Sequence, residues 1–435
     1  MHSIHSKSFL LYLYAEMKDY WSKLDNAGKI YPANVNIRNT TLFRIDINLK
    51  NRVNPGILQL ALDEIMPRFP YFHVKLKRGL FWYYFKKTEE QIMIRKDIYY
   101  PCTEWDFKKA GFLFTVKYGT KKIALEFSHS ITDGGGGLEF TKSLLLKYYQ
   151  LRGLTPADTA GIKIPGEDIP PKEYSDDFRQ FYDRHIPASK TERDKAFHLD
   201  YKLTQRGIYH VTTGCLDFRD IKALAVEKKL NLTALLCVIY LEVFQQIMYE
   251  RKSRPAPIVI NLPVNLRNIF ESRTMFNFFV SVTPGIDPRL GFFSEDDLIK
   301  HMRSYLSIEI DRRYVGKMIK RNIETENNIF VRIMPLFIKE MILPVIYRLY
   351  GERGYTSGIS NLGKIVFPAE IEEEIVSVNV IPPPSPGNLV KMIGFSFKEK
   401  FYITFGSLTE NKTVEMKFFS RLRKLGVPVK IDTVL

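Results

Sequence analysis

The stretch LEFSHSITDGGGGLEF, residues 125–140, decides how this chain is interpreted. It contains one histidine, His129, followed four residues later by Asp133 and then by four consecutive glycines. A histidine and an acid beside a glycine-rich turn can form a catalytic loop. The same residues can also form a core histidine followed by an aspartate-capped turn, so the rest of the chain has to separate the two interpretations.

Alternation of apolar residues before the histidine predicts a strand that ends at His129. Successive side chains of a strand point to opposite faces. One face is predicted to carry Ile123, Leu125, Phe127 and His129, and the other Ala124, Glu126 and Ser128. Burial on the apolar face holds the pKa of a histidine near or below neutrality, and a neutral imidazole is a suitable general base.

The four glycines are expected to let a ligand approach the backbone closely. Each costs roughly 1 kcal/mol in a helix relative to alanine, but glycine permits positive φ and close contact with the backbone. The backbone N–H groups of Gly134 and Gly135 lie ahead of a predicted helix, where anions and developing oxyanions are stabilised. Asp133 is expected to cap that helix or to pair with a buried arginine.

Length and charge limit the class of protein. A chain of 435 residues is long for one core and predicts two domains. The hydrophobic share of 45% and the charged share of 26% indicate a globular protein. The net charge of +16 favours acidic partners such as the phosphates of a nucleotide-like cofactor or anionic lipid. No arginine-rich tract or nucleic-acid motif is found, so nucleic acid is not expected as a partner.

The cysteines and the apolar runs favour a cytoplasmic protein without a transmembrane segment. Cys102, Cys215 and Cys237 are widely spaced and lack metal-ligand spacing, so neither disulfides nor a metal site is predicted. The apolar run after Lys7 is too short for a convincing signal peptide. The run at 333–350 is interrupted by charges and prolines, which argues against a membrane span.

Strand and helix signals alternate along the chain and predict an α/β (α+β) fold. A strand is predicted at 41–49, and a helix capped by Asn54 follows it. The region from about 152 to 190 is rich in proline, glycine and acids and is interpreted as a linker or crossover. The second half is expected to contain a buried helix at 231–249, apolar nearly all round, and a turn before a strand within 354–367.

The segment HSITDGGG resembles the His-x-x-x-Asp-Gly signature of the acyl-CoA-dependent acyltransferases related to chloramphenicol acetyltransferase, a superfamily that includes condensation domains of peptide synthetases. Four further segments resemble this superfamily in the expected order, at 58–76, 221–244, 262–280 and 357–365, and the likeness spans roughly residues 25–430. The alcohol-acetyltransferase-like branch fits best, since the plant-type Asp-Phe-Gly-Trp-Gly motif is missing. One departure is Ser128, which stands where many members have a first histidine.

The resemblance implies two chloramphenicol-acetyltransferase-like subdomains, residues 1–185 and 186–435, each a mixed sheet flanked by helices, with a tunnel between them. It implies direct transfer of an acyl group, with acetyl favoured, from acyl-CoA as co-substrate to a small or lipid-like alcohol or amine, without a permanently bound cofactor. His129 would be the general base.

The resemblance also gives roles to other residues. Asp133 would be a structural brace paired with an arginine, for which Arg44, Arg68 and Arg267 are candidates and Arg267 is favoured. Gly134 and Gly135 would donate to the oxyanion or shape the loop. Substrate contacts would come from Ser360, Asn361, Asn265 and Asn277, with turn chemistry as the alternative for the first two.

Two other functions stay open at this point. A condensation-type enzyme would take its thioester from an acyl carrier protein, and the basic balance of the chain allows an acidic carrier. A non-catalytic binding protein that has kept the fold is the second alternative, and Ser128 is the sequence feature that favours it.

Overall fold

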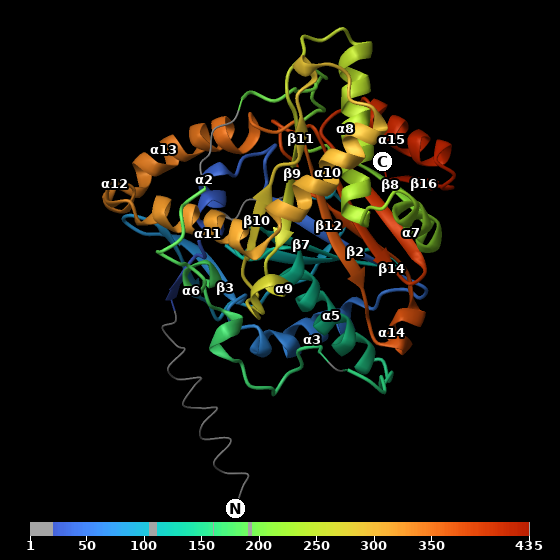
Figure 1. Cartoon of the computed structure of the whole chain (residues 1–435). Helices are drawn as coiled ribbons and strands as arrows, with labels where there is room; N and C mark the ends of the chain where they lie inside the picture. Colours follow the sequence, from blue (N-terminus) through green and yellow to red (C-terminus); the bar gives the residue numbers. More distant parts are fainter. Residues whose placement is uncertain (1–20, 104–110, 160, 190–193, 435) are drawn as a thin grey trace, which may run out of the picture.

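The computed structural model describes residues 21–103, 111–159, 161–189 and 194–434. Two large mixed sheets and one small sheet form its framework, and helices pack on their outer faces (Figure 1). The small sheet has the order β1 (Trp21–Lys23), β4 (Tyr83–Lys87), β3 (Val74–Arg78). The short helical segments are η2 (Gly28–Ile30), α2 (Tyr31–Asn34), η3 (Met66–Arg68), η4 (Pro171–Glu173), α6 (Asp177–Gln180), α9 (Arg267–Phe270), η5 (Pro288–Leu290) and α14 (Ala369–Glu374).

The first large sheet contains the strand that ends before His129. Its order is β13 (Ile375–Ile381), β2 (Leu42–Leu49), β7 (Lys122–Ser128), β6 (Phe114–Tyr118), β5 (Arg95–Lys96). The pair β5 and β6 is parallel and the other pairs are antiparallel. Phe43 and Phe127 lie on the face that packs in one core with α3 (Pro55–Ile65) and α5 (Gly134–Gln150). The predicted alternation therefore holds for this face.

The opposite face of this sheet is also buried, and it is ionic. Arg44 is 1% exposed and pairs with Asp46, Asp97 and Glu126. Lys117 lies 2.9 Å from the same glutamate. Although burial acts to raise the pKa of Asp97, its bonds to Arg44 hold that pKa at about 2. Both faces of β7 are thus covered, which fixes its end firmly where the histidine follows.

The second large sheet is eight-stranded and belongs to the second half of the chain. Its order is β10 (Phe279–Val282), β9 (Ile258–Asn265), β12 (Ser357–Ile365), β14 (Val390–Phe397), β15 (Lys400–Ser407), β8 (His210–Asp217), β16 (Lys430–Val434), and β11 (Gly285–Ile286) pairs with β9. Its core also contains residues of α7 (Phe218–Glu227), α8 (Leu232–Glu250), α10 (Glu295–Glu309) and α15 (Thr413–Lys424). Because β12 runs parallel to β9 and β14 while the other pairs are antiparallel, the sheet is mixed.

Helix α8 is the buried helix predicted at 231–249. Asn231 caps it by accepting a hydrogen bond from the backbone N–H of Ala234 at 2.8 Å. Among the described residues it is the one helix long and apolar enough to cross a membrane, but most of it is buried in the protein. We interpret α8 as a core helix.

The first sheet includes a strand from the second half of the chain. Strand β13, from the second half, pairs antiparallel with β2 at its edge. Met275 and Phe276 also join the core of the first half. The division of the chain near residue 185 stays a prediction: the second large sheet lies wholly after it, whereas the first sheet takes β13 from across it.

A helical segment follows α10, and its first helix packs on the second large sheet. It contains α11 (Arg312–Asn327), α12 (Ile329–Ile333), α13 (Leu336–Ile346) and the π-helix η6 (Tyr347–Glu352). In Figure 1, α12 and α13 lie at the left edge of the molecule. Helix α13 contacts α2, and α2 carries a residue of the site described next.

Candidate functional site

His129 directly follows β7, and its backbone N–H donates to the carbonyl of Thr41 at 3.0 Å. Its imidazole is partly buried among aromatic rings. The ring of Tyr31 stacks on it at 5.2 Å between centroids, and Phe43 lies at 4.9 Å and Phe279 at 6.2 Å. Residues from α2, β2 and β10 therefore surround the histidine, and the site is shared between the two halves of the chain.

Burial keeps the imidazole of His129 neutral. Removal from water lowers its pKa to about 4, and the positive charge of Lys391 acts in the same direction. Asp133 and Asn277 oppose this shift without cancelling it. Since the charged form is disfavoured, one ring nitrogen is available to accept a proton at neutral pH.

Asn277 determines which ring nitrogen that is. Its amide nitrogen donates to the carbonyl oxygen of His129 and to the carboxylate of Asp25, both at 2.9 Å. Its amide oxygen must then face Nδ1 of the imidazole, where the two atoms lie 3.5 Å apart. An amide oxygen only accepts, so Nδ1 carries the hydrogen and Nε2 keeps the lone pair. The arrangement holds His129 as a base through Nε2.

Asp25 accepts the hydrogen bond from Asn277 and was not predicted from the sequence as a residue of the site. Its side chain is almost fully buried and also accepts from the backbone N–H of Gly28 at 2.7 Å. Burial, reinforced by the charge of Asp176, raises the pKa of Asp25 to about 7. Asp25 precedes the predicted motif by about a hundred positions, and no local spacing connects it with His129.

Asp133 caps α5 and ties it to the other half of the chain. One carboxylate oxygen accepts from the N–H groups of Gly135 and Gly136 at 3.0 and 3.2 Å. The other accepts from Arg267 at 2.9 Å and from the N–H of Phe278 at 3.0 Å. Burial acts to raise the pKa of Asp133, but Arg267 and the N–H donors hold it below its ordinary value.

Arg267 joins this aspartate to the loop that carries Asn277. Its guanidinium donates to the carbonyl oxygens of Thr274 and Phe276 as well as to Asp133. Asn265 accepts from the backbone N–H of Arg267 at 3.0 Å and from its guanidinium at 3.3 Å. In the structure Asn265 therefore holds the arginine, and its contact with a substrate stays a prediction.

The other two arginine candidates pair elsewhere. Arg44 belongs to the ionic face of the first sheet. Arg68 forms two hydrogen bonds with Glu173, at 2.8 and 2.9 Å. Of the three candidates, Arg267 is the one that the structure places on Asp133.

The glycines of the run serve close packing and do not use the positive φ that glycine permits. None of the four is among the positive-φ residues of the chain. A Cβ at Gly136 would lie 2.2 Å from Oγ1 of Thr132 and 2.3 Å from the carbonyl oxygen of Met275, which no side chain can accept. The N–H of Gly135 is bonded to Asp133, so Gly135 takes part in shaping the loop, the second of the two roles predicted for it. Gly134 stays a candidate donor.

Ser360 and Asn361 lie within β12, and the predicted turn before a strand is wrong at these residues. The strand is interrupted by a bulge between Asn361 and Lys364, with Gly363 at φ +71°. The amide of Asn361 donates to Thr233 at 2.8 Å and accepts from the N–H of Gly363 at 3.0 Å. Both ends of this amide are used within the protein, which disfavours a direct substrate contact.

The bulge brings the second half of the chain against the glycine run. A Cβ at Gly134 would lie 2.9 Å from a methyl group of Leu362. Ser360 is partly buried beside this contact and stays a candidate for a substrate contact. Ser128, at the end of β7, is fully buried, and its hydroxyl oxygen lies 3.4 Å from that of Thr41 and accepts from the N–H of Ser130 at 3.2 Å.

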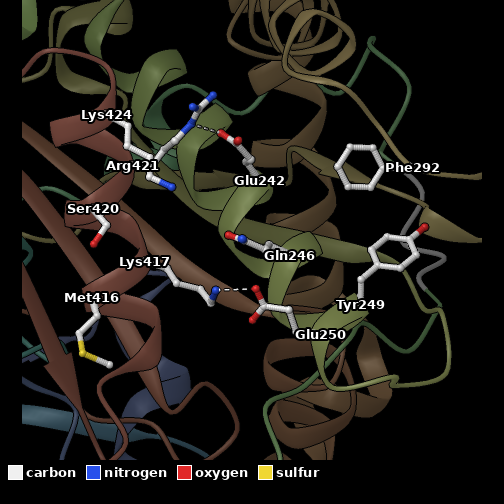
Figure 2. A pocket seen from close by; sticks show the side chains of 10 residues that line it. All are labelled: Glu242, Gln246, Tyr249, Glu250, Phe292, Met416, Lys417, Ser420, Arg421 and Lys424. Carbon is white, nitrogen blue, oxygen red and sulfur yellow. Dashed lines mark hydrogen bonds and ion pairs between the residues drawn. The ribbon is translucent and has the colours of Figure 1, made fainter.

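Among the cavities lined by described residues are two that do not include His129. Figure 2 shows the larger, of about 650 Å³, between α8 and α15. Its charged groups pair across it, with Lys417 at 2.7 Å from Glu250 and Arg421 at 2.8 Å from Glu242. The smaller, of about 230 Å³, is lined by residues 90–95 and 112–115. The tunnel between the subdomains stays a prediction.

A search of the described ranges for three or more His, Cys, Asp or Glu side chains that could hold a metal ion finds no such group. The charged residues nearest His129 are Asp25, Asp133 and Lys391, and they surround it from three different elements. Lys391 is partly buried on β14, and burial lowers its pKa to about 8. The site is thus a neutral base among buried charges.

The sequence matches no protein-family model and no curated protein. The fold, however, is similar to that of several solved structures. TRI101 of F. sporotrichioides, solved with coenzyme A and T-2, is 9% identical over 95% of this chain and 99% of that chain, with a TM-score of 0.61. Polyketide synthase associated protein 5 of Mycobacterium tuberculosis is 15% identical over 92% and 97% of the two chains, with a TM-score of 0.59.

A third similar structure is the epimerization domain from the third module of tyrocidine synthetase B, 14% identical over 94% of this chain and 96% of that one, with a TM-score of 0.59. At these identities the similarity establishes the fold. The predicted α/β fold, with mixed sheets flanked by helices, is confirmed, and it is the fold of these solved structures.

Proposed function

We propose that this chain, which has the fold of TRI101, solved with coenzyme A, and of a peptide-synthetase epimerization domain, transfers an acyl group from a coenzyme A thioester to an acceptor hydroxyl. The observation that carries the proposal is the neutral His129, with Nδ1–H directed at Asn277 and Nε2 left as the base. The net charge of +16 suits the phosphates of coenzyme A.

The reaction needs one base that gives its proton back. Nε2 of His129 takes the hydroxyl proton while the acceptor oxygen attacks the thioester carbonyl. The tetrahedral intermediate collapses, its carbon–sulfur bond breaks, and the thiolate leaves with the proton from the imidazolium. Ester and free thiol are formed, and His129 is neutral again. General-base help of this kind is worth roughly 10²- to 10⁴-fold.

The remaining acceleration would come from alignment of the two substrates and from charge stabilisation near the carbonyl. Gly134 is the candidate N–H donor, since the N–H groups of Gly135 and Gly136 are bonded to Asp133. Lys391 supplies a positive charge beside His129. Acetyl is the favoured acyl group and an alcohol the favoured acceptor.

Substitution Asn277→Ala is expected to lower kcat by about 5- to 10-fold with a smaller change in KM. The lost hydrogen bond is worth roughly 1 kcal/mol, which corresponds to this factor in rate. Without the amide oxygen opposite Nδ1, the tautomer with a free Nε2 loses its preference. The control is Asn379→Ala, because Asn379 also accepts hydrogen bonds, from Thr213 and Thr404, but lies away from His129. Equal losses in both variants would contradict the positioning role.

The pH dependence should show the lowered pKa of His129. The base is active when neutral, so kcat/KM should fall with an inflection near pH 4 as the pH is lowered, and not near 6.5. The same shift affects stability: the unfolded chain binds the proton below about 6.5, so the contribution of His129 to stability is lost as the pH falls from 6.5 towards 4. NMR of the ring protons, assigned by comparison with His129→Ala, measures this pKa; an inflection above 6 would contradict the prediction.

Asp25 predicts a second inflection in kcat/KM, separate from that of His129. Burial raises the pKa of Asp25 to about 7, so its carboxyl loses its proton as the pH rises through 7. The inflection near pH 7 should be missing in Asp25→Asn, whereas the one near pH 4 should stay.

A carrier-protein thioester is the second candidate donor, and the similarity to an epimerization domain of a peptide synthetase favours it. The comparison of acetyl-CoA with an acetylated carrier protein, at equal concentrations and with one acceptor, separates the two. Higher kcat/KM with the carrier would identify a condensation-type enzyme.

The third candidate, a non-catalytic binding protein, has weaker support. Ser128 is the residue that favoured it, and its buried hydroxyl is part of the packing at the end of β7.

A further inference from the structure

Helices α12 and α13 present an apolar face to solvent. Among the described residues, α12 buries none of its side chains. Phe330 is 72% exposed and Met341 73% exposed. The face, named here the apolar face, contains Ile329, Phe330, Ile333, Phe337, Met341 and Val345. Contiguous exposed apolar surface of this kind is rare in soluble proteins and marks an interaction site.

The turn between β3 and β4 extends the apolar face. The backbone N–H of Leu336, at the start of α13, donates to the carbonyl oxygen of Leu80 at 2.8 Å. Leu80 and Phe81 are themselves exposed. Lys339 points away from the surface: it is 2% exposed, its ammonium donates to the carbonyl oxygen of Phe81, and it lies over the ring of Trp82. The charge in the middle of α13 therefore does not interrupt the face.

The charges around the apolar face are positive. Between residues 329 and 349 the sequence contains one acid, Glu340, and its carboxylate is bonded to Arg78 and Tyr83. Arg332 and Arg348 are exposed in the same segment. An apolar helix face bordered by arginines fits the interfacial region of a membrane with anionic lipids, where apolar side chains enter the headgroup boundary and cations face the phosphates.

The inner side of the same segment reaches the site. Helix α13 contacts α2, whose Tyr31 stacks on His129. The π-helix that follows α13 begins with Tyr347. Burial raises the pKa of the Tyr31 phenol, and the nearby Tyr347 raises it further. At the other end of η6, Glu352 accepts from the hydroxyl of Ser385 at 2.6 Å. The outer face of this segment thus meets solvent while its inner end packs beside the base.

We propose that the apolar face docks on a membrane surface that contains anionic lipids, and that the acceptor is a lipid-like alcohol taken from that membrane. The second part rests on the proposed acyl transfer, whereas the docking does not. The segment does not span the bilayer: α12 and α13 are short, and they lie along the protein surface (Figure 1). Docking would place the neighbourhood of His129 next to the membrane.

Sedimentation with vesicles tests the docking. The full chain is mixed with vesicles of phosphatidylcholine alone or of phosphatidylcholine with phosphatidylglycerol. We expect binding to the mixed vesicles, weakened by salt, and a loss of at least about tenfold in partitioning for the triple variant Phe330→Ser, Phe337→Ser, Met341→Ser. The matched control is Leu290→Ser, Phe292→Ser, Met416→Ser, three exposed apolar residues on the other side of the molecule, and it should bind like wild type.

Three results would overturn the docking proposal. The first is failure of the wild type to bind mixed vesicles, and the second is an equal loss of binding in the two triple variants. The third is a wild-type dimer that dissociates only when Phe330, Phe337 and Met341 are changed. Such a dimer would make the apolar face a protein interface. Wild-type activity on a short soluble alcohol separates this inference from the proposed function. Transfer without vesicle binding would refute the docking alone, and vesicle binding without any transfer would refute the proposed function and the lipid-like acceptor.

Discussion

The substitution His129→Ala is expected to lower acceptor-dependent release of coenzyme A by roughly 10²- to 10⁴-fold. The reason is the loss of the single base whose Nε2 the structure leaves without a hydrogen, next to Asn277 and within the aromatic surroundings of Tyr31 and Phe43. Thiol release with and without acceptor measures it.

The matched control is His301→Ala, because His301 is exposed and its ring lies tilted against that of Tyr305, at 6.0 Å between centroids. It should keep wild-type activity. The melting temperatures of both variants should stay close to that of wild type, so that a loss of activity is not a loss of folding. If His129→Ala kept full acceptor-dependent activity while folded, the assignment of the base would be wrong.

The substitution Asp133→Ala is expected to cost about 3–5 kcal/mol of folding stability. It leaves the guanidinium of Arg267 without its carboxylate at 14% side-chain exposure, and it removes the acceptor for the N–H groups of Gly135, Gly136 and Phe278. Because Phe278 adjoins Asn277, activity should fall as well. Urea unfolding followed by fluorescence measures the stability.

Asp217→Ala is the control for the cap itself. Asp217 caps α7 and pairs with Arg219, as Asp133 caps α5 and pairs with Arg267, but the Arg219 pair is exposed to solvent. We expect the urea midpoint of Asp217→Ala to shift much less than that of Asp133→Ala. Similar shifts for the two variants would show that the buried ion pair contributes little.

Local patterns predicted the elements on either side of the site. Alternation in residues 122–128 identified the strand before His129, and the same logic placed Phe127 in the core. Helix caps were also readable, as at Asn231, because a cap needs only its neighbours along the chain. The sequence also indicated Arg267 as the partner of Asp133, but through the order of family-like motifs and not through spacing.

The rest of the site depends on contacts between distant segments. Asp25 meets Asn277 through folding of the whole chain, and no periodicity in either segment indicates it. The glycine run illustrates the same limit: the space that Gly136 leaves is filled by Met275, from the other half of the chain. The exposed helices α12 and α13 also gave no clear pattern, because apolar residues on a surface look like core residues in a sequence.

The most direct test of the central claim is transfer of a labelled acetyl group. Wild-type protein is incubated with acetyl-CoA labelled in the acetyl group and with alcohols of increasing chain length, and the products are identified by mass spectrometry. The account predicts labelled ester in equal amount to the free coenzyme A released, with no label on the protein and almost none transferred by His129→Ala. Absence of labelled ester for every alcohol, or equal ester formation by the folded His129→Ala variant, would contradict it.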